Sequence, residues 1–245
     1  MVKFGSFQDI GKVQCDEVWL IVRSLKTFPQ ASVPVLHIPD LSPSWQLFTE
    51  FQNKKNAGQW NKEMFENWYK PRFLKEMCSE KNTAMLQRLK TEAQTKDILC
   101  CCFCPDESMC HRSIIRQLLD ESKFALLIAG SRTFNNYEVL CRYADYFLQN
   151  QKGREIIIVS GGARGADALA EQYAKERGYT SVVMKADWDT FGKSAGYRRN
   201  EAMHQYLINY SKRGCLCFWD GQSKGTAHNF ELVKEYNTSL RTVKF

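Results

Sequence analysis

The hydrophobic residues in the second half of the chain form short continuous runs separated by amphipathic stretches. These runs predict five strands, at residues 125–129, 155–160, 181–185, 214–219 and 240–244. The stretches between them predict helices at residues 137–149, 166–177, 198–208 and 227–236. Buried strands that alternate with helices are typical of a parallel sheet covered on both faces. The pattern therefore predicts a Rossmann-like α/β domain over residues 124–245.

The first half has a less regular pattern, which predicts a smaller α/β domain over residues 1–122. Its strands are expected at residues 18–22 and 97–103, and its helices at residues 62–77, 83–95 and 113–122. A proline-marked stretch at residues 29–43 is expected to be extended. Only Ser122 and Lys123 are left to join the two domains.

Two glycine-bearing turns follow strands of the predicted Rossmann-like domain. The first, at residues 160–165, leads into the helix that contains Asp167, and the second covers residues 220–226. Glycine lets backbone N–H groups approach an anion, and the positive end of the following helix dipole stabilises that anion. The carboxyl ends of parallel strands meet at one edge of a sheet. The two turns therefore predict a shared site for a phosphate-bearing ligand, by default a nucleotide.

The composition narrows the class of protein. The chain has 245 residues, of which 44% are hydrophobic and 13% aromatic, as in globular domains. No apolar run approaches the roughly 20 residues that cross a bilayer, and the start lacks the apolar core of a secretion signal. A cytoplasmic protein with no membrane partner is therefore expected, and its ten cysteines are expected to be reduced.

The charge of the chain bears on its partners. The net charge of +7 permits contact with polyanions, but the basic residues are spread along the sequence. Nucleic acid is therefore not the favoured partner, because no nucleic-acid motif accompanies the charge. A nucleotide or nucleotide-derived small molecule is the expected partner, and association of the chain with a second copy of itself is left open.

Six motifs of the second half, in order, resemble the YspA-like branch of the SLOG superfamily. They lie at residues 129–134, 160–167, 186–188, 192–196, 199–203 and 218–228. The resemblance implies a Rossmann-like fold that holds nucleotides or nucleotide-derived molecules at the carboxyl ends of its strands. Some members of the superfamily hydrolyse the N-glycosidic bond of nucleoside monophosphates, some sense nucleotide-derived signals, and some bind single-stranded DNA. The resemblance thus implies a class of ligand and leaves the reaction open.

Carried over residue by residue, the resemblance implies a set of nucleotide-binding residues. Arg132 is expected to contact phosphate with two donors, and Trp188 either stacks on a base or packs at the rim. Arg164 and Lys193 either contact the ligand or are solvated charges. The full set comprises Gly130, Ser131, Arg132, Ser160, Gly161, Gly162, Ala163, Arg164, Gly165, Asp167, Trp188, Lys193, Asn200, Asp220, Gly221, Ser223, Lys224, Gly225 and Thr226.

The resemblance also implies a catalytic arginine, which Arg199 matches. The phosphoribohydrolase branch has a glutamate three positions beyond the Gly-Thr of its second turn, where this chain has Asn229. An amide lacks the negative charge that stabilises an oxocarbenium-like transition state. Hydrolysis therefore needs another carboxylate, and Asp187 is the preferred candidate because it follows the third predicted strand. The other candidates are Asp189, Asp220 and Glu231.

Three functions follow from these residues. The first is an N-glycosidic hydrolase of the phosphoribohydrolase type, with Arg199 and Asp187 as its catalytic residues. The second is a sensor or sponge that binds a nucleotide signal without turnover, which the amide of Asn229 favours. The third is a single-stranded DNA-binding protein.

The first half is similar to domain of unknown function family 488, chiefly through Val22-Arg23 and Cys110-His111-Arg112. The acidic residue expected before Val22 is Ile21, a departure from the family pattern. A thiol, an imidazole and a guanidinium at the start of a helix form a pocket for an anion, and this setting lowers the pKa of a nearby thiol. The candidate residues of this site are Arg23, Cys104, Cys110, His111 and Arg112.

Two roles remain open for this second site, a thiol nucleophile and a structural or phosphate-holding function. The spacing of Cys104 and Cys110 from Arg112 differs from the Cys-x5-Arg pattern of phosphatases. A metal site formed by the cysteines is a further possibility. Because alternate residues of a strand point to opposite faces, at most Cys100, Cys102 and Cys104 are expected to converge on one ion. The sequence also lacks the paired Cys-x2-Cys motifs that are typical of structural zinc sites. We therefore expect cysteines packed in an interior strand, with no metal and no cofactor.

Overall fold

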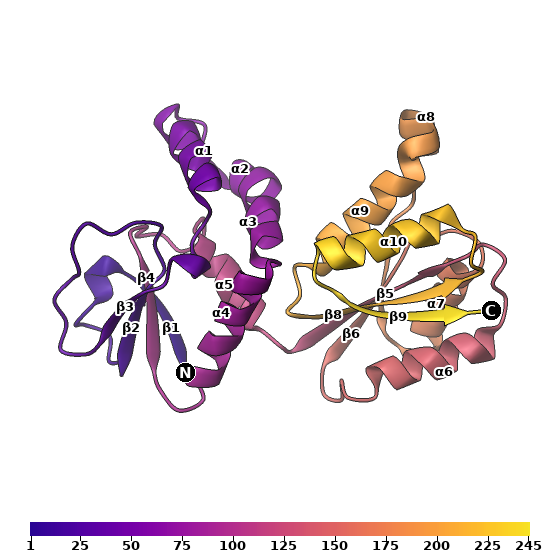
Figure 1. Cartoon of the computed structure of the whole chain (residues 1–245), viewed down its shortest axis with the longest axis horizontal. Coiled ribbons are helices and arrows are strands. Elements are labelled where there is room, and N and C mark those ends of the chain that lie inside the picture. The colour runs from indigo at the N-terminus through magenta and orange to yellow at the C-terminus, as the bar shows by residue number, and fades with distance from the viewer. The chain divides into compact units, whose positions relative to one another are not determined.

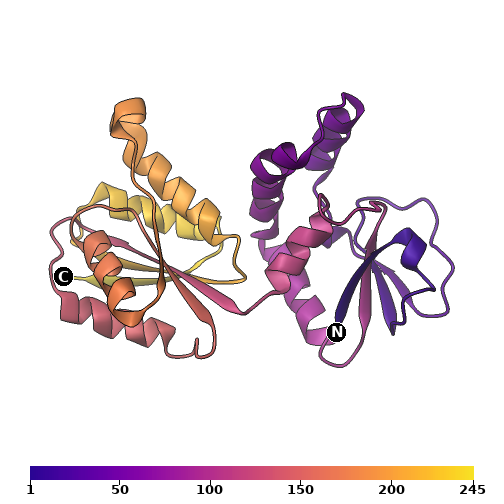
Figure 2. The same cartoon turned by 180° about the vertical axis from the view of Figure 1, so that it is seen from behind.

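The computed structural model describes residues 1–245, which divide into two compact units, Met1–Leu119 and Asp120–Phe245. Each unit has its own parallel sheet and its own helices (Figures 1 and 2). None of the helices combines the length and the apolar character that a bilayer crossing requires.

The C-terminal unit contains a five-stranded parallel sheet with strand order β7-β6-β5-β8-β9. The strands are β5 (Lys123–Gly130), β6 (Glu155–Ser160), β7 (Thr180–Val183), β8 (Lys212–Trp219) and β9 (Ser239–Lys244). The three central strands are buried on both faces, which explains their uninterrupted apolar runs. The unit is a Rossmann-like α/β fold, as the alternating pattern predicted.

The helices of this unit cover both faces of the sheet (Figure 1). The side chains of β5 alternate between the two faces. Leu126 and its alternate neighbours pack against α6 (Tyr137–Leu148) and α7 (Ala166–Arg177). Leu127 and its alternate neighbours pack against α9 (Ala195–Leu207) and α10 (Lys224–Glu235). This two-sided core fixes the first residues of α7 and α10 at the edge of the sheet where β5, β6 and β8 end.

Several ends of elements differ from the predicted ones. The helix α10 begins three residues earlier than predicted because the Ser223 hydroxyl accepts a hydrogen bond from the Thr226 N–H and caps it. Residues 224–226 therefore lie in the first turn of a helix, so the loop part of the second turn is short. A short helix, α8 (Trp188–Phe191), also follows β7 and was not predicted.

The N-terminal unit contains a four-stranded parallel sheet with strand order β1-β4-β2-β3. The strands are β1 (Val2–Ser6), β2 (Glu17–Leu20), β3 (Val35–His37) and β4 (Ile98–Cys102). Sequence patterns predicted β2 and β4 but missed β1 and β3, which are short and only partly buried. Strand β4 is central, so its three consecutive cysteines are buried.

The helices of the N-terminal unit are α1 (Trp45–Asn56), α2 (Lys62–Met64), α3 (Lys70–Met77), α4 (Glu80–Glu92) and α5 (His111–Leu119). The predicted helix at residues 62–77 is present, but a π-helical turn, Phe65–Tyr69, interrupts it just before Pro71. Proline has no N–H to donate and clashes with the preceding turn, so the helix widens at this point. Helix α5 begins at the end of the loop that follows β4.

We predict that Gly130→Ala destabilises the C-terminal unit. A Cβ atom at this position would lie 2.3 Å from the carbonyl oxygen of Phe218 and 2.9 Å from the Cβ of Ala166. Overpacking of this kind costs about 1–3 kcal/mol. The matched control is Gly225→Ala, since a Cβ there meets no atom within 4 Å. Urea denaturation should show a lower midpoint for the first variant only, and equal midpoints would contradict the packing described.

Candidate functional site

A cavity of about 370 Å3 lies at the edge of the sheet where β5, β6 and β8 end. Of the predicted nucleotide-binding residues, the structure brings eleven to its wall, and Arg199, the predicted catalytic arginine, joins them: Gly130, Arg132, Ala163, Asp167, Trp188, Lys193, Asn200, Asp220, Ser223, Gly225 and Thr226. It does not bring Ser131, Ser160, Gly161, Gly162, Arg164, Gly165, Gly221 and Lys224 to the wall. The wall also includes Asn229, Tyr197 and Gly196, which were not in the predicted set.

The centre of the wall is an ion pair between Arg199 of α9 and Asp167 in the first turn of α7. Arg199 Nη1 lies 3.2 Å from Asp167 Oδ2 and donates a 2.5 Å hydrogen bond to the Gly161 carbonyl. The Ala163 N–H donates to Asp167 Oδ2 at 3.3 Å. Asp167 is only 2% exposed, and burial raises its pKa although Arg199 opposes this effect. The pair therefore fixes the first glycine turn against α9.

The same helix also reaches the second glycine turn. Arg199 Nε donates to Asn200 Oδ1 at 3.0 Å, and Asn200 Nδ2 donates to the Gly225 carbonyl at 2.9 Å. Arg199 and Asn200 therefore connect the loop after β6 with the start of α10. This hydrogen-bond network holds the two turns in one arrangement before any ligand enters.

Two glycines of the first turn stand where the packing leaves no room for a side chain. A Cβ at Gly161 would lie 1.5 Å from Arg199 Nη1, so only glycine leaves room for the guanidinium. Gly165 has a φ of +80°, and a Cβ there would lie 2.4 Å from the Ser131 carbonyl oxygen. Of residues 160–165, Ala163 is the one that lines the cavity, and contact of the other backbone N–H groups with a ligand stays a prediction.

Two further cations lie in the wall. Arg132 and Lys193 form no ion pair with a carboxylate, and the Arg132 guanidinium lies 5.8 Å from the ring centre of Trp188. The Trp188 side chain is half exposed, which leaves a ring face free to contact a ligand. Asp220 also lines the cavity, but its carboxylate accepts hydrogen bonds from the N–H groups of Gln222 and Ser223.

The predicted catalytic carboxylate is elsewhere. Asp187 is exposed and does not line the cavity. Its Oδ1 accepts a 2.9 Å hydrogen bond from the Thr190 N–H, which caps α8, and the hydrogen bonds from Thr190 lower its pKa. The carboxylate beside Arg199 is Asp167 instead. Its place two residues after Gly165 put it in the predicted binding set, but nothing in the sequence spacing indicated its pairing with Arg199.

Asn229, which stands where the hydrolase branch has a glutamate, is buried in α10 and lines the cavity. Its Oδ1 accepts a 3.3 Å hydrogen bond from His204 Nε2 of α9. His204 is fully buried, and burial lowers its pKa to about 4. A neutral amide bonded to a neutral imidazole supplies no negative charge at this point of the wall.

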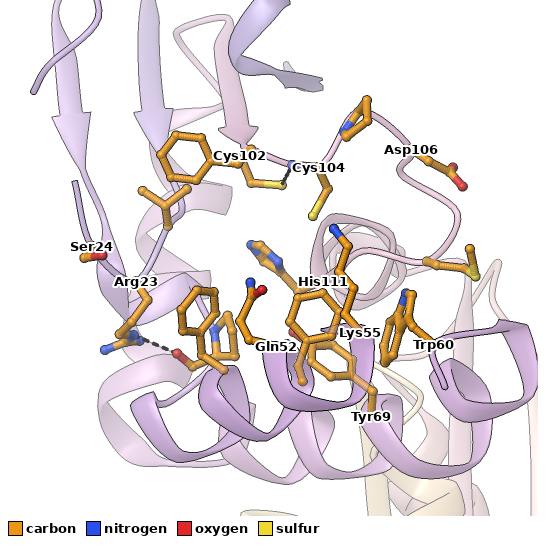
Figure 3. Close-up of a pocket in the computed structure, with 17 residues that line it drawn as sticks. Arg23, Ser24, Gln52, Lys55, Trp60, Tyr69, Cys102, Cys104, Asp106 and His111 are labelled. Carbon is orange, nitrogen blue, oxygen red and sulfur yellow. Dashed lines mark hydrogen bonds between the residues drawn. The ribbon is translucent and has the colours of Figure 1, made fainter. Parts of the chain in front are cut away.

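The N-terminal unit has a cavity of its own, of about 400 Å3, beside the end of β4 (Figure 3). Arg23, Cys104 and His111 line it, whereas Cys110 and Arg112 do not. Aromatic side chains form much of the remaining wall: Phe48, Phe51, Trp60, Tyr69 and Phe103. Arg23 donates hydrogen bonds to the carbonyls of Pro39, Ser42 and Pro43, so most of its donors hold a loop in place.

The thiols converge in a way that strand geometry did not predict. Cys100 is buried in the sheet, and it is Cys102 that meets Cys110, with the two sulfur atoms 3.2 Å apart. The loop after β4 turns back, so that the start of α5 lies against the end of that strand. Hydrogen bonds with Cys102 and Cys104 lower the pKa of the Cys110 thiol.

The comparisons with known proteins agree with this division. Residues 17–123 match the model of the active DUF488-N3 subclade, and residues 124–191 match the model of the YspA, cpYpsA-related SLOG family. The chain belongs to these two families, with one domain of each. The SLOG match includes Asp167 and Trp188, whereas Arg199 and the second turn lie beyond the matched residues. A SLOG domain is consistent with the binding or processing of a nucleotide-related ligand.

One relative is a phage protein. The Gene 61 protein of Mycobacterium phage D29 is 35% identical to the chain over 109 residues, which cover 42% of this chain and 82% of the phage protein. No solved structure matches the chain. The geometry of the two cavities is therefore the basis for any statement on function.

We predict that His204 makes the SLOG domain sensitive to acid. An unfolded histidine has a pKa of about 6.5, and burial lowers that of His204 to about 4. Between these values the unfolded chain binds a proton that the folded chain does not, so the free energy of unfolding falls as the pH falls. His204→Gln, which does not titrate, should reduce this loss by about 2 kcal/mol. Urea denaturation at pH 7 and pH 4.5 measures the difference, and identical losses would contradict it.

Proposed function

We propose that the SLOG domain binds a phosphorylated nucleotide or nucleotide-derived molecule in the cavity where β5, β6 and β8 end. The observation that carries the proposal is the excess of positive charge in the wall. Arg132 and Lys193 have no carboxylate partner there, and Arg199 Nη2 makes no hydrogen bond within the protein. Guanidinium groups bind phosphate oxygens with charge-assisted hydrogen bonds.

The start of α10 supports the same assignment. Ser223, Gly225 and Thr226 line the cavity, and the N–H groups of Lys224 and Gly225 in the first turn of α10 have no partner within the helix, whereas that of Thr226 donates to the Ser223 hydroxyl. Together with the helix dipole, these groups stabilise an anion. Because Asn200 holds the Gly225 carbonyl, the start of α10 is fixed relative to Arg199.

The size and the rim of the cavity suit the rest of a nucleotide. A volume of about 370 Å3 falls within the range of roughly 300–1,000 Å3 that is usual for small-molecule sites. Trp188 lies beside Arg132 at the rim and offers its ring to a base. We therefore propose that the base stacks on Trp188 and that the phosphate lies near Arg132, Lys193 and the start of α10.

Arg132→Gln should weaken binding, since a hydrogen bond to a charged group contributes about 1.5–3 kcal/mol, which corresponds to roughly 10–150-fold in affinity. Thermal stabilisation of the full chain by nucleoside monophosphates, NAD and ADP-ribose identifies a ligand, and calorimetry then gives its affinity. The matched control is Arg164→Gln, because Arg164 is exposed and lies outside the cavity wall. Equal weakening by both variants, or no effect of Arg132→Gln, would contradict the site.

N-glycosidic hydrolysis is the second candidate function, and the position of Asp167 favours it. In this hypothesis Asp167, rather than Asp187, is the carboxylate that acts with Arg199. Binding without turnover remains the better supported function, because Asp167 already holds the first turn and Asn229 supplies no charge.

Chromatography of the incubated nucleotides separates the two functions. If the chain is a hydrolase, free base accumulates, Asp167→Asn stops its release, and Asp187→Asn leaves the rate unchanged. Thermal stabilisation without released base rejects hydrolysis and supports a sensor or sponge. Binding that is confined to oligonucleotides and falls steeply with salt would instead support single-stranded DNA as the ligand.

A further inference from the structure

The DUF488 domain contains a cluster of donor atoms that the proposed function does not use. The thiol–imidazole cluster consists of Cys102 at the end of β4 and of Cys110 and His111 at the start of α5. All three side chains are buried, and their sulfur and nitrogen atoms lie within 4.8 Å of one another. The two sulfur atoms are 3.2 Å apart, and Cys110 Sγ is 3.6 Å from His111 Nδ1.

A hydrogen bond fixes which nitrogen of His111 can bind a ligand. His111 Nε2 lies 2.8 Å from the carbonyl oxygen of Ile21. A carbonyl accepts but does not donate, so Nε2 carries the proton and Nδ1 of the neutral ring keeps its lone pair. That lone pair faces Cys110. Histidines that bind metals usually donate their other N–H to a carbonyl or carboxylate in this way.

The spacing of the donor atoms suits a tetrahedral ion. Bonds of about 2.3 Å to sulfur and about 2.0–2.1 Å to nitrogen place a sulfur and a nitrogen roughly 3.6 Å apart, and two sulfurs roughly 3.8 Å apart. The distance from Cys110 to His111 is already 3.6 Å. The sulfur of Cys102, now at 3.2 Å from that of Cys110, needs a small rotation of its side chain.

A buried positive charge lies beside the cluster, and the thiolate is the form of cysteine that binds a metal. Arg112 is 1% exposed and forms no ion pair with a carboxylate. Its Nη2 donates to the Cys104 carbonyl at 2.6 Å, and its buried Nε has no partner. A buried guanidinium needs a negative charge nearby, and the thiols of the cluster are within its reach.

The cluster is also open on one side. Cys102 and His111 line the cavity, whereas Cys110 lies behind them. Cys104 lines it too, and Figure 3 shows the side chains of Cys102, Cys104 and His111 directed toward the same region. The Cys104 N–H donates to Cys102 Sγ at 3.3 Å, which places Cys104 beside the cluster. Three ligands with a fourth position that faces a cavity are typical of zinc sites that also bind a substrate or a water molecule.

We propose that Cys102, Cys110 and Nδ1 of His111 form a binding site for a zinc-like divalent ion, with the fourth position facing the cavity of the DUF488 domain. Soft sulfur ligands and one imidazole select zinc over magnesium or calcium. This site goes beyond the proposed nucleotide site and is independent of it.

Titration of the reduced, metal-free full chain with Co2+ tests the proposal, since a thiolate bound to Co2+ gives a charge-transfer absorption band. We expect one equivalent of Co2+ to produce the band and Zn2+ to remove it. Cys110→Ser should weaken Co2+ binding by about 100-fold or more, because even changes in residues behind the ligands cost about 10–100-fold. Cys101→Ser is the matched control, because Cys101 is equally buried but points to the opposite face of β4.

A second measurement needs no variant and covers the case in which Cys110→Ser fails to fold. Zn2+ should slow the alkylation of Cys102 and Cys110 by iodoacetamide in the wild-type chain, as mapped by mass spectrometry, and should leave Cys141 unchanged. The proposal is overturned if Co2+ produces no thiolate band, if folded Cys110→Ser binds Co2+ as tightly as the wild-type chain, or if Zn2+ does not protect the two cysteines. A disulfide between Cys102 and Cys110 that forms whether or not Zn2+ is present would also overturn it.

Discussion

The cavity of the SLOG domain is organised around one largely buried ion pair, Arg199 with Asp167, whose side chains are 15% and 3% exposed. The pair joins α9 to the first turn of α7, and Arg199 extends the connection to the Gly161 carbonyl and to Asn200. Removing one partner of a buried pair leaves an uncompensated charge, which costs about 3–5 kcal/mol. Because Gly161 leaves space for the guanidinium and Gly165 lets α7 approach the loop after β5, the sequence of the first turn serves this pair. The shape of the cavity follows from it.

Because the turns are fixed, the charged groups of the cavity wall also have defined positions. Arg132 and Lys193 lie on the wall together with the start of α10, and Trp188 forms the rim. A site built in this way needs little rearrangement when an anionic ligand binds, which lowers the cost of binding.

The DUF488 domain has a different kind of chemistry. Its cavity is mainly apolar and contains sulfur and imidazole groups at the end of β4, which suit a soft cation rather than a phosphate.

Sequence patterns predicted the elements that are long and buried. The strands β5, β6 and β8 and the helices between them followed from apolar runs and helical periodicity, because burial on both faces requires those runs. The strands β1 and β3 were missed because short, half-buried strands have no comparable pattern. Eleven of the nucleotide-binding residues that the resemblance implied line the cavity together with Arg199, whereas Asp187, chosen because it follows the third predicted strand, does not. Pairing between side chains on different helices depends on packing, so the contact of Asp167 with Arg199 has no signal in the spacing of residues.

Hydrogen–deuterium exchange of the full chain, with and without AMP or ADP-ribose at saturating concentration, shows whether a ligand occupies this cavity. If the ligand fills the cavity between the two turns, the backbone amides of residues 161–167 and those of residues 223–226 should both exchange more slowly in its presence. Protection of neither turn, or protection confined to elements away from the ends of β5, β6 and β8, would contradict the account.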